Sequence, residues 1–118
     1  MANNYTLSAR NTMVAALPAT LFIALHTQDP GQTGNFEVAG TTRQPVSLEI
    51  ASNGERSVSE SFVDIEVASG DVISYIGVFT AATGGTFIAS VDVQEATFNQ
   101  DSVYRVSDIS FDLNLTVA

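Results

Sequence analysis

Short segments in which apolar and polar residues alternate recur along this chain, and they limit its fold more than any other feature. Between residues 109 and 117 every second side chain is apolar, from Ile109 to Val117, and the side chains between them are polar. Residues 46–50 and 63–67 show the same alternation. Because successive side chains of a strand point to opposite faces of a sheet, each segment is predicted to be a strand with one buried face.

Turn-forming residues separate these segments from further apolar stretches. The turn signals are Asp29-Pro30-Gly31, Asn53-Gly54, Ser69-Gly70 and Gly84-Gly85. Additional strands are predicted over residues 20–27 (buried on both faces), 56–61, 72–79, 86–93 and 103–106. Strands at this spacing indicate an all-β fold. We expect one single-domain antiparallel β-sandwich over residues 1–118, jelly-roll-like, with about eight strands.

One short helix is predicted near the N-terminus. Apolar residues recur at helical spacing between Ala9 and Leu17, Ser8 is a suitable N-cap, and Pro18 ends the pattern. Residues 1–7, which precede this helix and are mostly polar, are predicted to be a docking arm.

The predicted core combines the inward positions of the alternating strands with the central apolar stretches. It comprises Phe22, Leu25, Val46, Leu48, Phe62, Ile65, Ile76, Val78, Phe87, Ile109, Phe111, Leu113 and Leu115. Gly77 interrupts one apolar strand, which indicates a bulge or the close approach of another group.

The charge and cysteine content exclude several classes of partner. The chain has 4 basic residues, all arginine, and 13 acidic ones, for a net charge of −9. We expect no binding to nucleic acid or to anionic membranes, because both need an excess of cations. The absence of cysteine excludes disulfides and thiolate metal sites and favours folding in a reducing cytoplasm. The acidity serves solubility or complements a basic protein surface.

Few residues are arranged for chemistry. His26 is the single histidine, and a histidine can act as a base or a metal ligand. However, no G-x-S-x-G segment accompanies it, and zinc needs three or four nitrogen or sulfur ligands. We therefore expect His26 to end a strand and hydrogen-bond to the following loop. No enzymatic activity, cofactor or metal is expected.

Two further patterns have a structural and a functional interpretation. The acids Asp64, Glu66 and Asp71 could hold a cation, but the strand alternation favours a solvated face. Gly84-Gly85 lacks the lysine of a phosphate-binding loop, so a hairpin turn is favoured.

Residues 28–44 are predicted to form an ordered surface loop that starts at the Asp-Pro-Gly turn. Arg43, near its end, is suited to bind a carboxylate through two parallel hydrogen bonds. Either it clamps the loop by binding Asp29 or Glu37, or it contacts a partner protein. The loop and interface candidates are His26, Asp29, Pro30, Gly31, Gly34, Glu37, Arg43, Gly84 and Gly85.

Two segments of the chain resemble a family of small bacteriophage virion proteins, which are tail-fibre-like or minor structural proteins and some of which sit on heads. The first is LHTQDPGQTGNFEV at residues 25–38, followed by TRQPV at residues 42–46. The second spans residues 58–88 and contains GVFTAATGGTF. The resemblance implies a small all-β domain without a catalytic residue, assembled as a trimer on the virion exterior. Its implied partners are other virion proteins, and its implied location is the virion, assembled in the host bacterial cytoplasm.

Three functions from different classes follow. The expected one is a non-enzymatic accessory protein that decorates or stabilises the capsid, bound to the major capsid protein. The alternative is a minor tail or tail-fibre-type protein at the tail tip, including a receptor- or glycan-binding module. An enzyme such as a cell-wall hydrolase is disfavoured by the single histidine and scattered acids.

Overall fold

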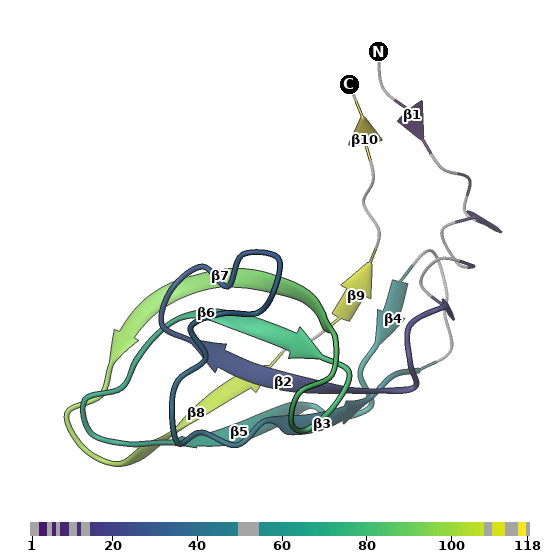
Figure 1. The fold of residues 1–118 in the computed structure, drawn as a ribbon. Coiled ribbons are helices and arrows are strands. Elements are labelled where there is room, and N and C mark those ends of the chain that lie inside the picture. Colours follow the sequence, from purple (N-terminus) through teal and green to yellow (C-terminus); the bar gives the residue numbers. More distant parts are fainter. Residues whose placement is uncertain are drawn as a thin grey trace.

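The chain folds into antiparallel β-strands, which confirms the predicted all-β class (Figure 1). The structure is a computed structural model that describes residues 3–4, 6, 8–9, 12, 15–49, 55–107, 110–112 and 116–117. These residues form ten strands, where about eight were predicted. The finer assignment to a jelly-roll-like sandwich stays a prediction.

The largest sheet has four strands in the order β3-β2-β6-β7. Its members are β2 (Thr20–His26), β3 (Gln44–Ser47), β6 (Val72–Phe79) and β7 (Phe87–Thr97). At the centre of the sheet Ile23 pairs with Val78 and Ala24 with Gly77. Since paired residues share a face, Ile23 and Val78 lie on one face of the sheet, and Ala24 and Gly77 lie on the other.

A second layer lies beside the four-stranded sheet. β5 (Phe62–Val67) pairs with β8 (Ser102–Ser107) along the full length of both strands. Figure 1 shows these two strands running beneath β2 and β6. β4 (Glu55–Ser57) pairs with β9 (Ser110–Asp112) next to them.

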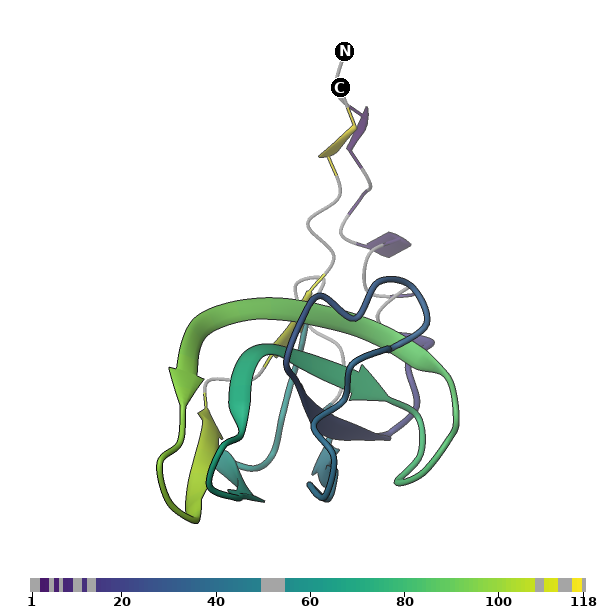
Figure 2. The same ribbon diagram turned by 60° about the vertical axis from the view of Figure 1, so that its left-hand side comes forward.

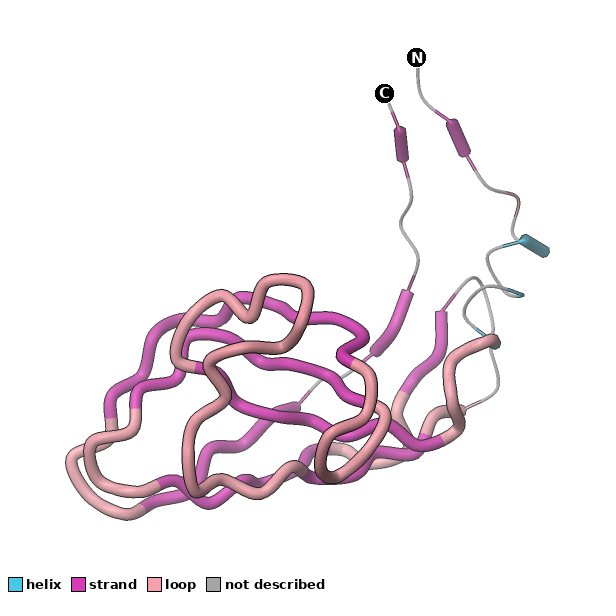
Figure 3. Tube along the Cα trace, in the orientation of Figure 1, coloured by secondary structure: helices cyan, strands magenta, loops and turns pink. Residues whose placement is uncertain are grey.

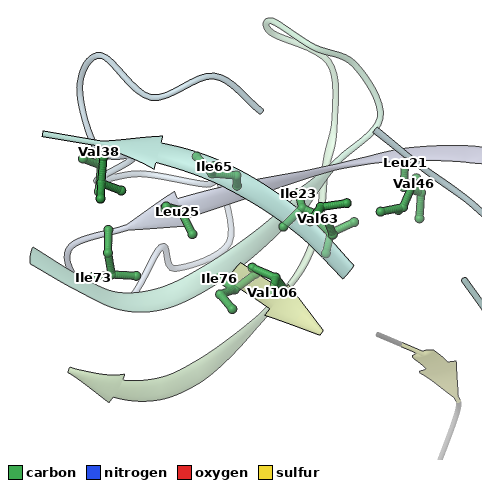
Figure 4. Close-up of a cluster of buried hydrophobic side chains, with 12 residues drawn as sticks. Leu21, Ile23, Leu25, Val38, Val46, Val63, Ile65, Ile73, Ile76 and Val106 are labelled. Carbon is green, nitrogen blue, oxygen red and sulfur yellow. The ribbon is translucent and has the colours of Figure 1, made fainter. Parts of the chain in front are cut away.

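The hydrophobic core lies between the two layers (Figure 4). Of the predicted core residues, Leu25, Val46, Ile65, Ile76 and Val78 are buried there. The alternation of β5 places Val63, Ile65 and Val67 inward. Further buried members that were not in the predicted core are Leu21, Ile23, Val38, Val63, Val67, Ile73 and Val106.

Three predicted core residues lie elsewhere. Phe62 is exposed, because it occupies the outward face of β5 together with Asp64 and Glu66. Phe22 and Phe87 are half-buried on strands β2 and β7. Leu48 is partly buried and packs against the core. The side chains of Ile109, Phe111, Leu113 and Leu115, and the predicted Asn53-Gly54 turn, lie outside what the structure describes.

The two ends of the chain come together. β1 (Asn3–Asn4) pairs with β10 (Thr116–Val117), and Figures 1 and 2 both place this pair away from the sheets. Within the predicted helix the described residues Ser8, Ala9, Thr12 and Ala15 are helical, and the other residues through 14 are not described. The helix therefore stays a prediction.

The N-cap of this segment differs from the one predicted. The amide of Ala9 donates a 3.1 Å hydrogen bond to Oγ1 of Thr6, which is the contact that an N-cap side chain makes. Ser8 itself has helical backbone conformation. Both hydroxyls are suitable caps, and the sequence analysis named Ser8.

Candidate functional site

The segment between β2 and β3 folds back over the outer face of the four-stranded sheet. His26 forms an antiparallel bridge with Glu37, the amide of Thr27 donates to the carbonyl of Phe36, and the amide of Val38 donates to that of Leu25. In Figure 3 this loop crosses above the strands. We call residues 27–43 the covering loop.

The Asp-Pro-Gly turn shapes the tip of the covering loop. Oδ1 of Asp29 accepts a 2.9 Å hydrogen bond from the amide of Gly31, which has a φ of 67°. The carbonyl of Pro30 accepts from the amides of Gly34 and Asn35, and the Pro30 ring is buried. Asp29 therefore stabilises the turn locally and does not bind Arg43.

His26 lies at the centre of a small aromatic cluster under the covering loop. Its ring is fully buried, stacks on Phe79 at 5.9 Å between centroids, and meets the edge of Phe87 at 6.2 Å. The backbone of Gly77 closes the cluster from below, because a Cβ at this position would overlap the imidazole. Gly34 closes it from above, because a Cβ there would lie 2.7 Å from the Phe79 ring.

The hydrogen bonding of His26 identifies its tautomer. Nδ1 lies 2.7 Å from the carbonyl oxygen of Asn35, which can only accept, so Nδ1 carries the proton. Nε2 is buried without a hydrogen-bond partner in the described residues. Burial lowers the pKa of His26 below 6.5. The Asn35 carbonyl and the Glu37 carboxylate raise this pKa, but the effect of burial is larger. Arg43 lowers the pKa as burial does.

We predict that mild acid destabilises the protein through His26. The folded state holds this ring neutral with a lowered pKa, whereas the unfolded chain protonates it near 6.5. The contribution of His26 to the free energy of unfolding should be fully present above that pH. Below it, this contribution should fall by at most about 1.4 kcal/mol per pH unit for one proton.

Urea denaturation between about pH 7 and pH 5 measures this effect, because carboxylates titrate mainly near about pH 4. The His26→Gln variant keeps a polar side chain but cannot titrate, so its stability should vary less over the same range. Equal pH dependence in the two proteins would contradict the prediction.

Arg43 ties the covering loop to the hairpin between β6 and β7. Its guanidinium donates two hydrogen bonds to the Glu37 carboxylate, at 2.8 and 3.0 Å. It donates two more, both of 2.9 Å, to the carbonyls of Ala81 and Gly84. Its carbon Cζ also lies 3.6 Å from the centroid of the Phe79 ring. Glu37 is one of the two acids that the sequence offered for this clamp.

Gly84 and Gly85 form the turn that presents these carbonyls. Both have positive φ, 63° and 74°, and the amide of Thr80 donates to the carbonyl of Thr86 across the hairpin. The turn receives the Arg43 side chain through the Gly84 carbonyl. In this structure the hairpin accepts hydrogen bonds from the Arg43 guanidinium through the backbone oxygens of Ala81 and Gly84.

Three acidic residues on and next to the second layer make local contacts. Asp64 binds Arg105 across β5 and β8, Asp71 accepts from the amide of Ala68, and Asp101 accepts from that of Ser69. Glu66, Asp71 and Asp101 line a groove of about 510 Å³. No group of three or more metal-ligating residues occurs among the described residues. Arg105 lowers the pKa of Asp64 through its hydrogen bond.

The nine sequence candidates thus lie in one region, where hydrogen bonds connect several of them. Arg43 joins Glu37 to Gly84, His26 joins Asn35 to the sheet, and Asp29 shapes the turn. Sequence reasoning missed the aromatic floor, Phe79 and Phe87, which flank the Gly84-Gly85 hairpin in the sequence. Their positions on the two strands that this turn joins, where they pair with each other, are the signal that could have found them.

A third aromatic residue, which lies in the covering loop itself, was also missed. Phe36 is 52% exposed and has a φ of 64°, although left-handed backbone is unfavourable for a bulky side chain. The Thr27–Phe36 hydrogen bond and the bridge between His26 and Glu37 hold it there.

The comparison with protein families decides the class of protein. A family model described as podophage GP4 fiber I protein gp80 matches residues 1–114. The chain belongs to this family. No curated protein matches the chain. Membership of the gp80 fibre family identifies this chain as a bacteriophage virion structural protein, which associates with other virion proteins as part of the particle.

Membership of the gp80 fibre family favours the alternative location over the preferred one. The sequence analysis favoured capsid decoration, whereas a fibre family agrees better with the alternative, a tail-fibre-type protein. Within the described residues, no helix is long and apolar enough to cross a membrane.

Proposed function

We propose that this protein is a non-enzymatic structural component of a tail fibre, docked to its neighbours through the strands at its two ends. The family match over residues 1–114 carries the proposal. The pairing of β1 with β10, away from the sheets, supports the terminal strands as the attachment point (Figure 2). A short two-stranded ribbon is marginally stable alone in water, so contact with a neighbour would stabilise it.

The buried state of His26 supports a structural role. Its ring has no solvent exposure and its Nδ1 proton is donated to a backbone carbonyl, so it cannot accept a proton from a bound substrate at that atom. The residues that looked most chemical in the sequence hold the covering loop in place instead.

Density for this chain in intact particles tests the location. We expect it at the tail, with β1 and β10 facing the neighbouring virion protein. A variant lacking residues 1–7 should fold but be absent from particles. Density on the capsid shell would refute the tail-fibre assignment, and normal incorporation of the shortened variant would refute the docking role of the arm.

The exposure of Phe36 favours a second candidate function, a receptor-contacting fibre module. Strained, exposed aromatic residues are costly for folding, and strain of this kind concentrates at functional sites. Aromatic residues also dominate the energetics of protein contacts. The covering loop would present Phe36 to the host surface on a rigid support.

The Phe36→Gly variant separates this role from a purely structural one. Glycine adopts positive φ without strain, so we expect the free energy of unfolding to rise by about 1 kcal/mol. Adsorption of phage to host cells should fall. The matched variant Phe62→Gly, at another exposed phenylalanine in a regular strand, should lose stability and keep adsorption. Unchanged adsorption in Phe36→Gly would refute the receptor role.

A further inference from the structure

The tip of the covering loop, residues 28–36, rests on the aromatic cluster around His26 (Figure 3). The carbonyl of Asn35 lies 2.7 Å from Nδ1 of the imidazole and accepts its proton. Gly34 lies so close to the ring of Phe79 that a Cβ would overlap it. The tip therefore stays on the sheet partly through a hydrogen bond whose donor can be titrated.

The base of the tip is suited to act as a hinge. The amide of Thr27 donates a 3.0 Å hydrogen bond to the carbonyl of Phe36, and this bond closes the tip. Just beyond it, Val38 is buried in the core, and its amide donates a 2.9 Å hydrogen bond to the carbonyl of Leu25. The tip can therefore lift while the covering loop stays anchored at Val38. Lifting would also release the positive φ of Phe36.

The closed tip accommodates only the neutral imidazole of His26. A protonated ring carries an N–H at Nε2 as well as at Nδ1. In the structure Nε2 is buried, has no partner among the described residues, and faces the backbone of Gly77 so closely that a Cβ there would overlap it. A proton on Nε2 would therefore be a buried donor without an acceptor, and burying a charge in this way is strongly unfavourable.

The charged groups near His26 do not supply the missing acceptor. Both oxygens of the Glu37 carboxylate accept hydrogen bonds from Arg43, whose own positive charge opposes a second one nearby. On the sheet side, the uncharged phenol of Tyr75 is next to His26 on β6, and Asp92 follows on β7. Neither is bonded to Nε2. Protonation therefore favours a state in which the ring reaches water.

We propose that protonation of His26 opens the tip of the covering loop, so that the tip is a local acid-driven switch on an otherwise folded domain. The closed state has the lowered pKa of the buried ring, whereas in the open state the ring titrates near 6.5, so acid favours opening. Opening removes the cover from the rings of Phe79 and Phe87. The switch is independent of where the protein sits on the particle.

Hydrogen exchange of the wild-type protein tests the switch. The reporter is the amide of Thr27, and the amides of the β5–β8 pairing are the internal reference. Each protection factor is taken relative to an unstructured peptide at the same pH. We expect the protection of Thr27 relative to the reference to fall by up to about 30-fold between about pH 7.5 and pH 5, which is about tenfold per pH unit below 6.5. An unchanged ratio would overturn the proposal.

Two variants show whether His26 is the group that titrates. His26→Gln keeps a donor for the Asn35 carbonyl but does not titrate, so its ratio should not depend on pH. Phe36→Gly keeps His26 and relieves the closed tip of an unfavourable φ, so Thr27 should be better protected at neutral pH and show the same fall in acid. An equal fall in His26→Gln, or no fall in Phe36→Gly, would overturn the proposal. If His26→Gln does not fold, the wild type and Phe36→Gly decide.

Discussion

Replacing Gly77 with alanine is expected to destabilise the protein by about 3 kcal/mol, the upper part of the range for overpacked cores. The added Cβ would overlap Nε2 of His26, and it would also lie 3.3 Å from the Phe87 ring. The imidazole cannot move aside easily, because Asn35 and Phe79 hold it on two sides. Urea denaturation measures the loss.

Whether Gly77→Ala destabilises or stabilises the protein shows why glycine is needed at this position. Gly77 does not have a positive φ, so its backbone conformation is open to alanine. At such a strand position alanine is normally more stable than glycine by about 0.5–1 kcal/mol. If His26 is the obstacle, Gly77→Ala should cost little or become stabilising in the His26→Ala background. An equal cost in both backgrounds would show that the contact with His26 is not the reason for glycine.

The Arg43→Met variant is expected to lose about 2–3 kcal/mol of stability. Methionine keeps an apolar stem over Phe79 but removes the donors to Glu37, Ala81 and Gly84. Breaking a buried ion pair costs about 3–5 kcal/mol, and we reduce this figure because the Glu37 side chain is partly exposed. Arg43→Lys should recover only part of the loss, since an ammonium cannot reach all three acceptors at once.

Arg105 is a matched control for Arg43 within the same chain. It also binds a carboxylate through two nitrogens, at 2.8 and 3.0 Å to Asp64, and also lies over a phenylalanine, Phe62, at 3.7 Å. Its side chain is exposed to solvent. Arg105→Met should therefore have a much smaller effect on stability, because exposed ion pairs contribute little. Equal losses at the two positions would contradict the importance that we assign to burial.

Hydrogen exchange locates the consequence of the Arg43 change. Amides of the covering loop, such as those of Thr27, Gly34 and Asn35, are bonded within the loop itself. They should exchange faster in Arg43→Met, while the β5–β8 pairing should keep its protection. Uniform loss of protection in both layers would mean that Arg43 supports the whole fold and not the covering loop alone.

The sequence predicted the second layer well and the first layer less completely. The alternation over residues 63–67 fixed which side chains of β5 face inward, because a period of two leaves one choice of face. In β2 both faces are apolar, so the pattern correctly placed Leu25 in the core but also placed Phe22 there, and it did not identify Leu21 and Ile23. Nor could it say that His26 lies under a loop on the opposite face.

The candidate region was predicted as a set of residues but not as an arrangement. Turn chemistry identified Asp29, Gly31 and Gly84, because these residue types have strong conformational preferences of their own. The choice of Glu37 over Asp29 as the partner of Arg43 depended on how the covering loop folds back along β2. That fold-back joins groups that are distant in sequence, and no local preference encodes it.

By itself the sequence determined the strand-rich class of this fibre-family protein, its acidic character and the positions of its main turns. Each follows from properties that single residues or short segments have anywhere: side-chain polarity, formal charge and backbone freedom. The tertiary structure alone decided that Gly77 must lack a side chain, that His26 is neutral and caged, and that Arg43 binds Glu37 and not Asp29. Those three facts are relations between segments that meet only when the two layers and the covering loop have packed.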